Sequence, residues 1–197
     1  MLAKRKGFYV TRSRRLWLVV AVGAVALSTV AFTMSAGAGP KDARATLRDV
    51  NGNVVGIVKL SLDDGKIGVK ATVDGLPAGF HGFHIHSVGT CDPTVGFVSA
   101  GGHLNPNGAT HPSHAGDQPV LLVNGDGTAE LRFASDRYTI DDLFDADGSA
   151  FIVHAGADNY ANIPTRYSAA GIPGPDAATL ATGDAGARSA CGVILPG

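Results

Sequence analysis

All seven histidines of this chain lie between residues 81 and 154. Imidazole nitrogens are common ligands of zinc and copper, so this grouping indicates metal chemistry. His84 and His86 are two residues apart in an apolar run, and in a strand their side chains would emerge on one face. His81 has the opposite parity and stands beside Gly82, so we interpret it as a structural histidine.

A second group of possible ligands follows in a stretch rich in glycine and proline. Its members, His103, His111, His114 and Asp117, fall within 15 residues. Three imidazoles and one carboxylate would fill a tetrahedral zinc and leave no position open, which is typical of structural rather than catalytic zinc. The alternative interpretation is a polar surface loop whose histidines bind nothing.

His154 ends the apolar run Ala150–Val153 and would reach the site from another strand. With His84 and His86 it supplies three nitrogens, a set that suits copper as well as zinc. Because the loop group already has the composition of a closed zinc site, we interpret the strand group as a site for a redox metal. A histidine in such a position is, by itself, more often a structural residue at the edge of a barrel than a ligand.

The elements that must position these residues are strands. Apolar and polar residues alternate over 67–73 and 129–133, and turns rich in Gly, Asn and Asp separate such runs. The pattern predicts an all-β sandwich or barrel of eight strands, with at most one helical turn at 139–144. The predicted strands are 43–50, 54–62, 67–74, 79–86, 119–123, 128–134, 149–154 and 189–194.

Two predicted connections are long, 87–118 and 155–188. Loops of this length in a compact domain are uncommon unless they bind a ligand or are disordered. The first contains the four possible zinc ligands, and the second begins directly after His154. We therefore expect both to be functional loops.

The first 38 residues have the order of a secretory leader. Six basic residues precede an uncharged, mostly apolar run from Leu16 to Phe32, and residues 36–38 (Ala-Gly-Ala) fit a small-x-small cleavage site. Residues 13–16 (Ser-Arg-Arg-Leu) resemble the twin-arginine export pattern. We predict a signal peptide over 1–38, one domain over 39–197, and export to the cell envelope or the medium. An uncleaved membrane anchor is the alternative, since the apolar run is at the lower limit for spanning a bilayer.

Charge and cysteine content narrow the class of protein. The leader holds six of the 16 basic residues and none of the 17 acidic ones, so the rest of the chain has ten basic residues and a net charge of −7 with His neutral. An acidic domain without a run of Lys or Arg argues against a nucleic-acid partner. Cys91 and Cys191 are the only cysteines, and in an exported chain they suggest one disulfide rather than two buried thiols.

Together these motifs resemble the copper/zinc superoxide dismutase family. The similarity is carried by residues 81–86 (His-Gly-Phe-His-Ile-His), 102–106, 114–117 and 186–194, in the family's order. It implies an eight-stranded Greek-key β-sandwich or barrel, an architecture of which this family is itself an established example. It also implies dismutation of superoxide to dioxygen and hydrogen peroxide by a redox-cycling copper next to a structural zinc.

The resemblance implies a role for each residue. Copper would be held by His84, His86, His103 and His154, and zinc by His103, His111, His114 and Asp117. The imidazole of His103 would thus bridge both metals, and it would also deliver a proton to the product. Asp158 would hydrogen-bond a histidine of each site and fix its tautomer. Arg188 would face the open copper position and hold superoxide, and Cys91 and Cys191 match the disulfide within the subunit.

Two departures from the family pattern bear on the site. His111 and His114 are three residues apart, with Pro112 between them, where eukaryotic members have a longer segment. Those members also guide superoxide with lysines in the last long loop, whereas this chain has no lysine after Lys70. Arg188 and the metals are then the obvious attractors of the anion. No motif indicates an oligomeric state.

Three other functions fit part of the pattern. A non-catalytic copper/zinc-binding module of the same fold would be expected to lose the arginine, the disulfide or a copper ligand, and this chain keeps them all. A cupin-type metalloenzyme would need a glutamate soon after His86, but the only glutamate is Glu130. A zinc hydrolase would need an open zinc and a general base, and the His-Glu-x-x-His and Gly-x-Ser-x-Gly motifs are absent.

Overall fold

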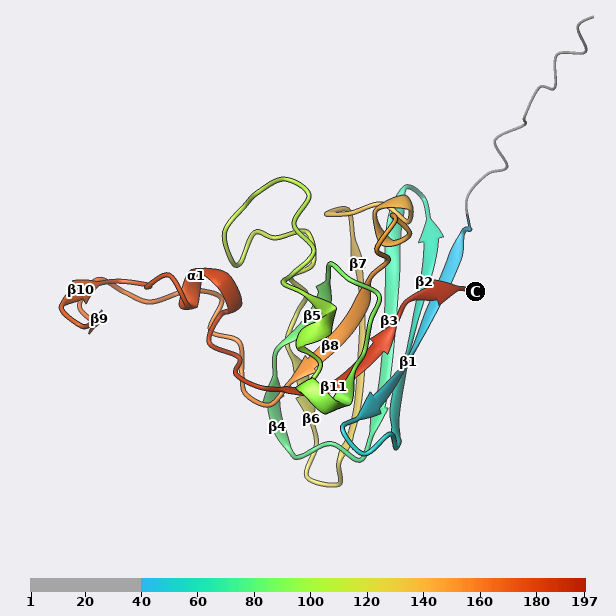
Figure 1. Ribbon diagram of the computed structural model, residues 1–197, viewed down its shortest axis with the longest axis horizontal. Helices are drawn as coiled ribbons and strands as arrows, with labels where there is room; N and C mark the ends of the chain where they lie inside the picture. The colour runs from blue at the N-terminus through green and yellow to red at the C-terminus, as the bar shows by residue number, and fades with distance from the viewer. Residues whose placement is uncertain (1–39) are drawn as a thin grey trace, which may run out of the picture. The chain divides into compact units, whose positions relative to one another are not determined.

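The computed structural model describes residues 40–197, in which nearly all regular structure is β-strand (Figure 1). The predicted signal peptide over 1–38 lies outside the described residues. In chain order the elements are β1 (Asp42–Asp49), β2 (Val54–Asp63), β3 (Lys66–Asp74), β4 (Gly79–His81), β5 (Phe83–His86), β6 (Leu121–Val123), β7 (Thr128–Ser135), β8 (Ala150–His154), β9 (Ser168–Ala169), β10 (Ile172–Pro173), α1 (Thr179–Thr182), β11 (Arg188–Val193) and β12 (Leu195–Pro196). A 3-10 turn at Asp141–Leu143 confirms the short helical turn predicted at 139–144.

The larger sheet is antiparallel and holds eight strands. Its order is β5-β8-β11-β1-β2-β3-β7, with β12 added beside β1, and a smaller sheet pairs β4 with β6. β3 and β7 are neighbours although β4, β5 and β6 lie between them in the chain, which is the long return connection of a Greek key. The all-β Greek-key prediction is therefore confirmed.

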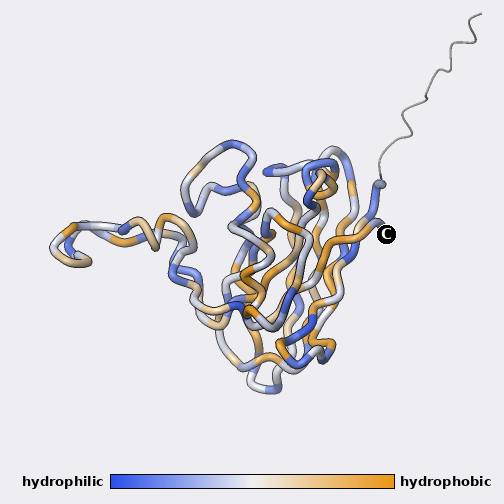
Figure 2. The backbone as a smooth tube through the Cα atoms, in the orientation of Figure 1, coloured by the Kyte–Doolittle hydropathy of each residue, from blue (hydrophilic) through white to orange (hydrophobic). Residues whose placement is uncertain are grey.

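Alternating polarity explains how the strands present one face to the core. Residues 43, 45 and 47 of β1 are buried while the residues between them are exposed, and β3 repeats this pattern. Figure 2 shows the alternation as a change of colour along these strands. The inward side chains pack into one core, in which the stacked rings of Phe83 and Phe151 lie 5.0 Å apart. Burial of each such large side chain contributes about 1.5–3 kcal/mol.

The prediction of one strand over 79–86 is wrong, because the segment forms two strands. β4 pairs with β6, whereas β5 pairs with β8, and the chain changes sheet at Gly82. The N–H of Gly82 donates to Gly156 O, and its carbonyl accepts from the N–H of His154, both at 2.8 Å. A Cβ at Gly82 would lie 2.6 Å from the Cβ of Ala185, so a side chain would not fit there. Alternation of polarity cannot reveal a change of strand partner.

The two long connections contain more regular structure than the sequence predicts. The first, 87–118, holds 3-10 turns at Pro93–Val95 and Val98–Ala100, and the predicted disulfide between Cys91 and Cys191 ties it to β11. The second, 155–188, holds α1 and the β9–β10 hairpin, which Figure 1 shows at the end of an extended loop. Within residues 40–197, no helix has the length and apolar character needed to cross a membrane.

Candidate metal centre

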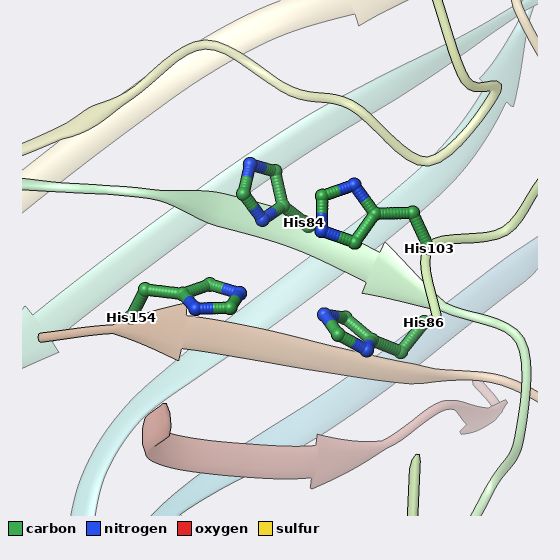
Figure 3. Close-up of side chains that lie close together, drawn as sticks. All are labelled: His84, His86, His103 and His154. Carbon is green, nitrogen blue, oxygen red and sulfur yellow. The ribbon is translucent and has the colours of Figure 1, made fainter. Parts of the chain in front are cut away.

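Four histidine rings converge beside β5 and β8 (Figure 3). β5 supplies His84 and His86, and its antiparallel neighbour β8 supplies His154. The fourth ring, His103, comes from the loop 87–118, whose backbone forms an isolated β-bridge with His86. The ring centroids of His84 lie 4.1 Å from that of His103 and 4.8 Å from that of His154. The structure thus brings the four predicted copper ligands together, each with a ligand atom within 4.8 Å of the others.

The predicted zinc ligands gather around the Nδ1 atom of His103. Asp117 Oδ1 lies 2.7 Å from His103 Nδ1, 3.1 Å from His111 Nδ1 and 3.3 Å from His114 Nδ1. The N–H of His114 donates to Asp117 Oδ2 at 2.9 Å, which orients the carboxylate. Besides the four histidines above, one further set of side chains has ligand atoms that all lie within 4.8 Å of one another. This set contains three of the predicted zinc ligands, His103, His111 and Asp117, and it contains His84 instead of His114. His114 is nevertheless adjacent, since its Nδ1 is 3.3 Å from His103 Nδ1.

Buried nitrogens without a hydrogen-bond partner mark where cations would fit. Within residues 40–197 the histidine nitrogens of this kind are His84 Nδ1, His86 Nε2, His103 Nε2, His111 Nδ1 and His154 Nε2. Burying a polar atom without a partner costs about 1–3 kcal/mol, so such a cluster would be strongly unfavourable without a ligand. A set of imidazoles and one carboxylate suits both copper and zinc. The residues present therefore fit the two metals.

Burial keeps the strand histidines neutral, which is the form that binds a metal. It lowers the pKa of His84, although a hydrogen bond to Asp158 acts against it. It lowers the pKa of His86 well below the usual value, and that of His154 to about 3. At neutral pH these three rings therefore offer a nitrogen lone pair rather than a charge.

Asp158 connects a predicted copper ligand on β5 to a predicted zinc ligand in the loop 87–118. Its Oδ2 lies 2.7 Å from His84 Nε2 and its Oδ1 lies 2.8 Å from His111 Nε2, with all three side chains buried. Burial alone would raise the pKa of Asp158, but the hydrogen bonds from His111 and His84 outweigh burial and hold that pKa far below its usual range. For His111, burial lowers the pKa, but the contacts with the carboxylates of Asp117 and Asp158 outweigh burial and raise it to about 9. His84 Nδ1 is thus left without a partner, whereas His111 Nδ1 lies 3.1 Å from Asp117 Oδ1 and at neutral pH carries a proton that a metal would displace.

Two backbone carbonyls orient the remaining strand ligands in the same way. His86 Nδ1 lies 2.9 Å from the carbonyl oxygen of Gly101, and His154 Nδ1 lies 3.0 Å from that of Gly186. A carbonyl can only accept, so each Nδ1 carries the hydrogen and each Nε2 keeps a free lone pair that could bind a metal. The sequence did not predict a role for Gly101 or Gly186, because the contacts use backbone carbonyls, which every residue has, and not a particular side chain.

The loop 155–188 encloses His111 with further residues that sequence reasoning missed. The ring of Tyr160 stacks on His111 at an interplanar angle of 3°, with centroids 6.4 Å apart. The N–H of His111 donates to Leu180 O at 2.9 Å. Gly183 packs so closely that a Cβ there would lie 2.5 Å from His111 Nε2. The sequence pointed to Tyr160, Leu180 and Gly183 only in that all three belong to a loop predicted to be functional.

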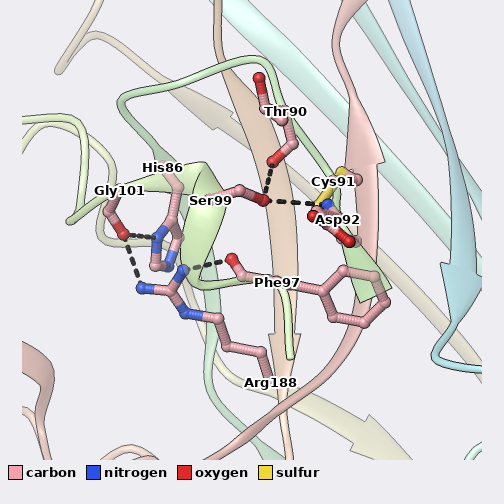
Figure 4. The surroundings of a disulfide bond; sticks show 9 residues. His86, Thr90, Cys91, Asp92, Phe97, Ser99, Gly101 and Arg188 are labelled. Atoms are coloured by element: carbon pink, nitrogen blue, oxygen red, sulfur yellow. Dashed lines mark hydrogen bonds between the residues drawn. A yellow bond between two sulfur atoms is a disulfide. The ribbon is translucent and has the colours of Figure 1, made fainter. Parts of the chain in front are cut away.

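Arg188 begins β11 directly opposite His154. Its guanidinium donates to the carbonyl of Phe97 and, at 2.6 Å, to that of Gly101 (Figure 4). The carbonyl of Gly101 also accepts from His86, so the arginine and a strand ligand share one anchor. Besides burial and neighbouring histidines, the charge of Arg188 contributes to lowering the pKa of His86 and of His154. Through the shared Gly101 carbonyl and its pairing with His154, Arg188 is therefore close to two of the predicted copper ligands.

His81 stays outside the cluster, as its parity predicts. Its Nδ1 lies 2.7 Å from the carbonyl oxygen of His154, and its Nε2 lies 2.8 Å from that of Pro77. Both ring nitrogens are therefore used in contacts that hold the fold together.

Comparison with known proteins connects the chain to one family. A family model described as copper/zinc superoxide dismutase (SODC) matches residues 54–194. A Cu-Zn superoxide dismutase from Mycobacterium tuberculosis is 44% identical over 173 residues, which cover 81% of this chain and 72% of that protein. An extracellular Cu-Zn superoxide dismutase from Brugia pahangi is 32% identical over 156 residues, covering 76% of this chain and 73% of that protein. The crystal structure of a SOD-like protein from Bacillus subtilis matches with a TM-score of 0.62 and 31% identity, covering 77% of this chain and 97% of that one.

Proposed function

The chain belongs to the copper/zinc superoxide dismutase family, and from this membership we propose a role for each residue of the histidine cluster. The protein is an enzyme that dismutes superoxide to dioxygen and hydrogen peroxide, with copper and zinc as its cofactors. When bound, copper supplies the one-electron redox chemistry, and zinc stabilises the loop that carries its ligands.

The proposed copper ligand atoms are buried nitrogens without a hydrogen-bond partner: His84 Nδ1 and the Nε2 atoms of His86, His103 and His154 would hold copper. The proposed zinc ligand atoms are those gathered around one carboxylate oxygen: the Nδ1 atoms of His103, His111 and His114 would hold zinc together with Asp117 Oδ1. One observation carries this proposal. His103 belongs to both ligand groups, with Nδ1 2.7 Å from Asp117 Oδ1 and a buried Nε2 that has no hydrogen-bond partner.

In the proposed mechanism, Arg188 binds the superoxide anion beside the strand ligands. Its hydrogen bonds to Phe97 and Gly101 already fix the guanidinium, so little ordering cost remains when the anion arrives. When its Nε2 is not occupied by copper, His103 can hold a proton from solvent at that atom and pass it to the peroxide product, and solvent supplies the second proton that hydrogen peroxide needs. Asp158 keeps the rings of His84 and His111 in the tautomer that presents Nδ1.

Metal content and superoxide turnover of the purified protein test these roles. Wild-type protein should hold about one copper and one zinc per chain. Arg188→Ala should keep both metals and lose about 10- to 100-fold in turnover, the effect of one lost charge-assisted interaction. Arg166→Ala removes the same charge from the loop 155–188 away from the cluster and should leave turnover unchanged. Equal rates of superoxide turnover for wild type and Arg188→Ala would show that Arg188 does not bind the substrate.

We also propose that the protein is exported and that residues 1–38 are removed as a signal peptide. The order of basic, apolar and small residues supports this proposal, as does the Cys91–Cys191 disulfide, since such bonds persist in oxidising compartments. A relative named as extracellular gives further support. N-terminal sequencing of protein from the envelope and the medium should give a start near residue 39, whereas an intact N-terminus in the membrane fraction would support the anchor.

A further inference from the structure

Four basic side chains form a row across the outer face of the large sheet. Arg44 of β1 is directly opposite Lys59 of β2, Lys59 is opposite Lys70 of β3, and Lys70 is opposite Arg132 of β7. These four residues, here called the basic row, are far apart in the sequence, so only the register of the sheet brings them into line. β1, β2 and β3 lie side by side in Figure 1, and none of the four strands carries a residue of the histidine cluster.

The basic row is unfavourable for the fold. Like charges directly opposite each other on neighbouring strands destabilise a sheet. The row uses four of the ten basic residues in a domain whose net charge is −7. Among residues 40–197, the only ion pair that involves the row joins Arg132 Nε to Glu130 Oε1 at 2.7 Å. A charge pattern that opposes stability is expected where it serves binding.

The shape of the surface indicates the size of the ligand. All four cations line one shallow depression of about 580 Å³, whose lining also includes Asp42, Phe133 and Gly197. Four neighbouring strands span about 14 Å, since adjacent strands lie about 4.8 Å apart. A single small anion would contact only part of such a row, so the ligand must carry several charges along an extended chain.

We propose that the basic row binds a linear polymer with repeated phosphate groups. Arg and Lys are both suited to phosphate, and a row of cations in a depression matches a string of anions better than the flat surface of a bilayer. Single-stranded nucleic acid is normally held by base stacking on aromatic rings, and the one aromatic residue of the lining, Phe133, is partly buried and packs against the core. Bound in this way, the enzyme would be held on an anionic polymer by strands that do not carry the metal centre.

The test uses the metal-loaded protein and linear inorganic polyphosphate as the probe. Binding is measured by calorimetry over a range of salt concentrations around 0.15 M. Because four cations are engaged, the logarithm of the affinity should fall with the logarithm of salt concentration with a slope of about −3. Lys59→Gln/Lys70→Gln should weaken binding at least about tenfold and roughly halve that slope.

A matched control separates the basic row from overall charge. Lys66→Gln/Arg166→Gln removes two positive charges outside the row and should leave the affinity nearly unchanged. All variants should keep full dismutase turnover, since none of these residues belongs to the metal centre. At the same concentration, polyphosphate should raise the melting temperature of wild-type protein more than that of Lys59→Gln/Lys70→Gln, because the variant binds it more weakly.

Three results would overturn the proposal. The first is no polyphosphate binding by the wild type, and the second is an equal loss of affinity in the two double variants. The third is tighter binding, at equal charge concentration, of a single-stranded oligonucleotide or of vesicles containing anionic lipid.

Discussion

The two halves of the proposed metal centre are built from different kinds of structure. The strand half stands on β5 and β8, where ladder hydrogen bonds and the core fix the proposed ligands His84, His86 and His154. The loop half stands on the connection 87–118, where isolated bridges, one disulfide and Asp158 hold the proposed ligands His111, His114 and Asp117. The sheet therefore fixes the positions of the strand residues, whereas cross-links fix those of the loop residues. We expect substitutions in the two halves to have different effects on metal binding.

Removing one ligand from each half should give the largest contrast. His154→Ala should lose copper and turnover together, by more than the roughly 10- to 100-fold that loss of an outer hydrogen-bond partner costs. His114→Ala should lose zinc while a large part of the copper stays bound. Metal analysis of both variants, purified in parallel, checks this. Loss of both metals in both variants would show that the halves are one cooperative unit.

Removing the disulfide should destabilise the protein as a whole. The bond closes a loop across 100 residues of sequence, so Cys91→Ser/Cys191→Ser should lose about 4 kcal/mol of unfolding free energy, because the unfolded chain is no longer constrained. Urea unfolding of the metal-loaded proteins measures the change. The zinc content should fall more than the copper content, since the bond anchors the loop and not β5. A change below about 1 kcal/mol would mean that the metals alone hold the loop.

Asp158→Asn should weaken both halves together. An amide has one acceptor oxygen and one NH₂ group, so it cannot accept from the rings of His84 and His111 at the same time. We expect the affinities for copper and for zinc each to fall about 10- to 100-fold, as measured by competition with chelators. Asp147→Asn, which removes the same charge from an exposed position, is the control and should change neither. An effect on one metal alone would contradict the bridging role.

In metal-free protein, His154 and His111 should give opposite pH trends, which is the smallest of the expected effects. Burial lowers the pKa of His154 to about 3, so the stability that this neutral ring contributes is present above the unfolded pKa of about 6.5 and is lost as the pH falls. The pKa of His111 is raised to about 9, so its contribution is present below about 6.5 and is lost as the pH rises toward 9. The melting temperature of metal-free protein should therefore be highest near neutral pH. A steady rise up to pH 9 would contradict this balance.

Local pattern was enough to predict the all-β class and the shared face of His84 and His86. Strand parity is a property of consecutive residues, so it can be read without knowing which strands pair. The break at Gly82 could not be predicted in this way, because it depends on the close approach of Ala185 and on hydrogen bonds with the segment after β8. The basic row was hidden for the same reason, since it exists only in the register of four strands.

The grouping of the loop ligands rested partly on their spacing and partly on the family resemblance. The spacing of His103, His111, His114 and Asp117 suggested one site, and the structure gathers all four side chains. Asp158 carries no local signal for its position between two rings, and only the resemblance pointed to it. The carbonyls of Gly101 and Gly186 had no signal of either kind. The roles of these residues in holding metal remain predictions that the variants above can test.

The carbonyl of Gly101 has a consequence for how such an enzyme could change over time. This carbonyl accepts hydrogen bonds from both His86 and Arg188, so one peptide group sets the orientation of the His86 ring and the position of the Arg188 guanidinium. A substitution that shifts this peptide would change the metal-binding geometry at His86 and the binding of superoxide at Arg188 at the same time. These two properties are thus inherited as a pair, and selection on one of them necessarily acts on the other.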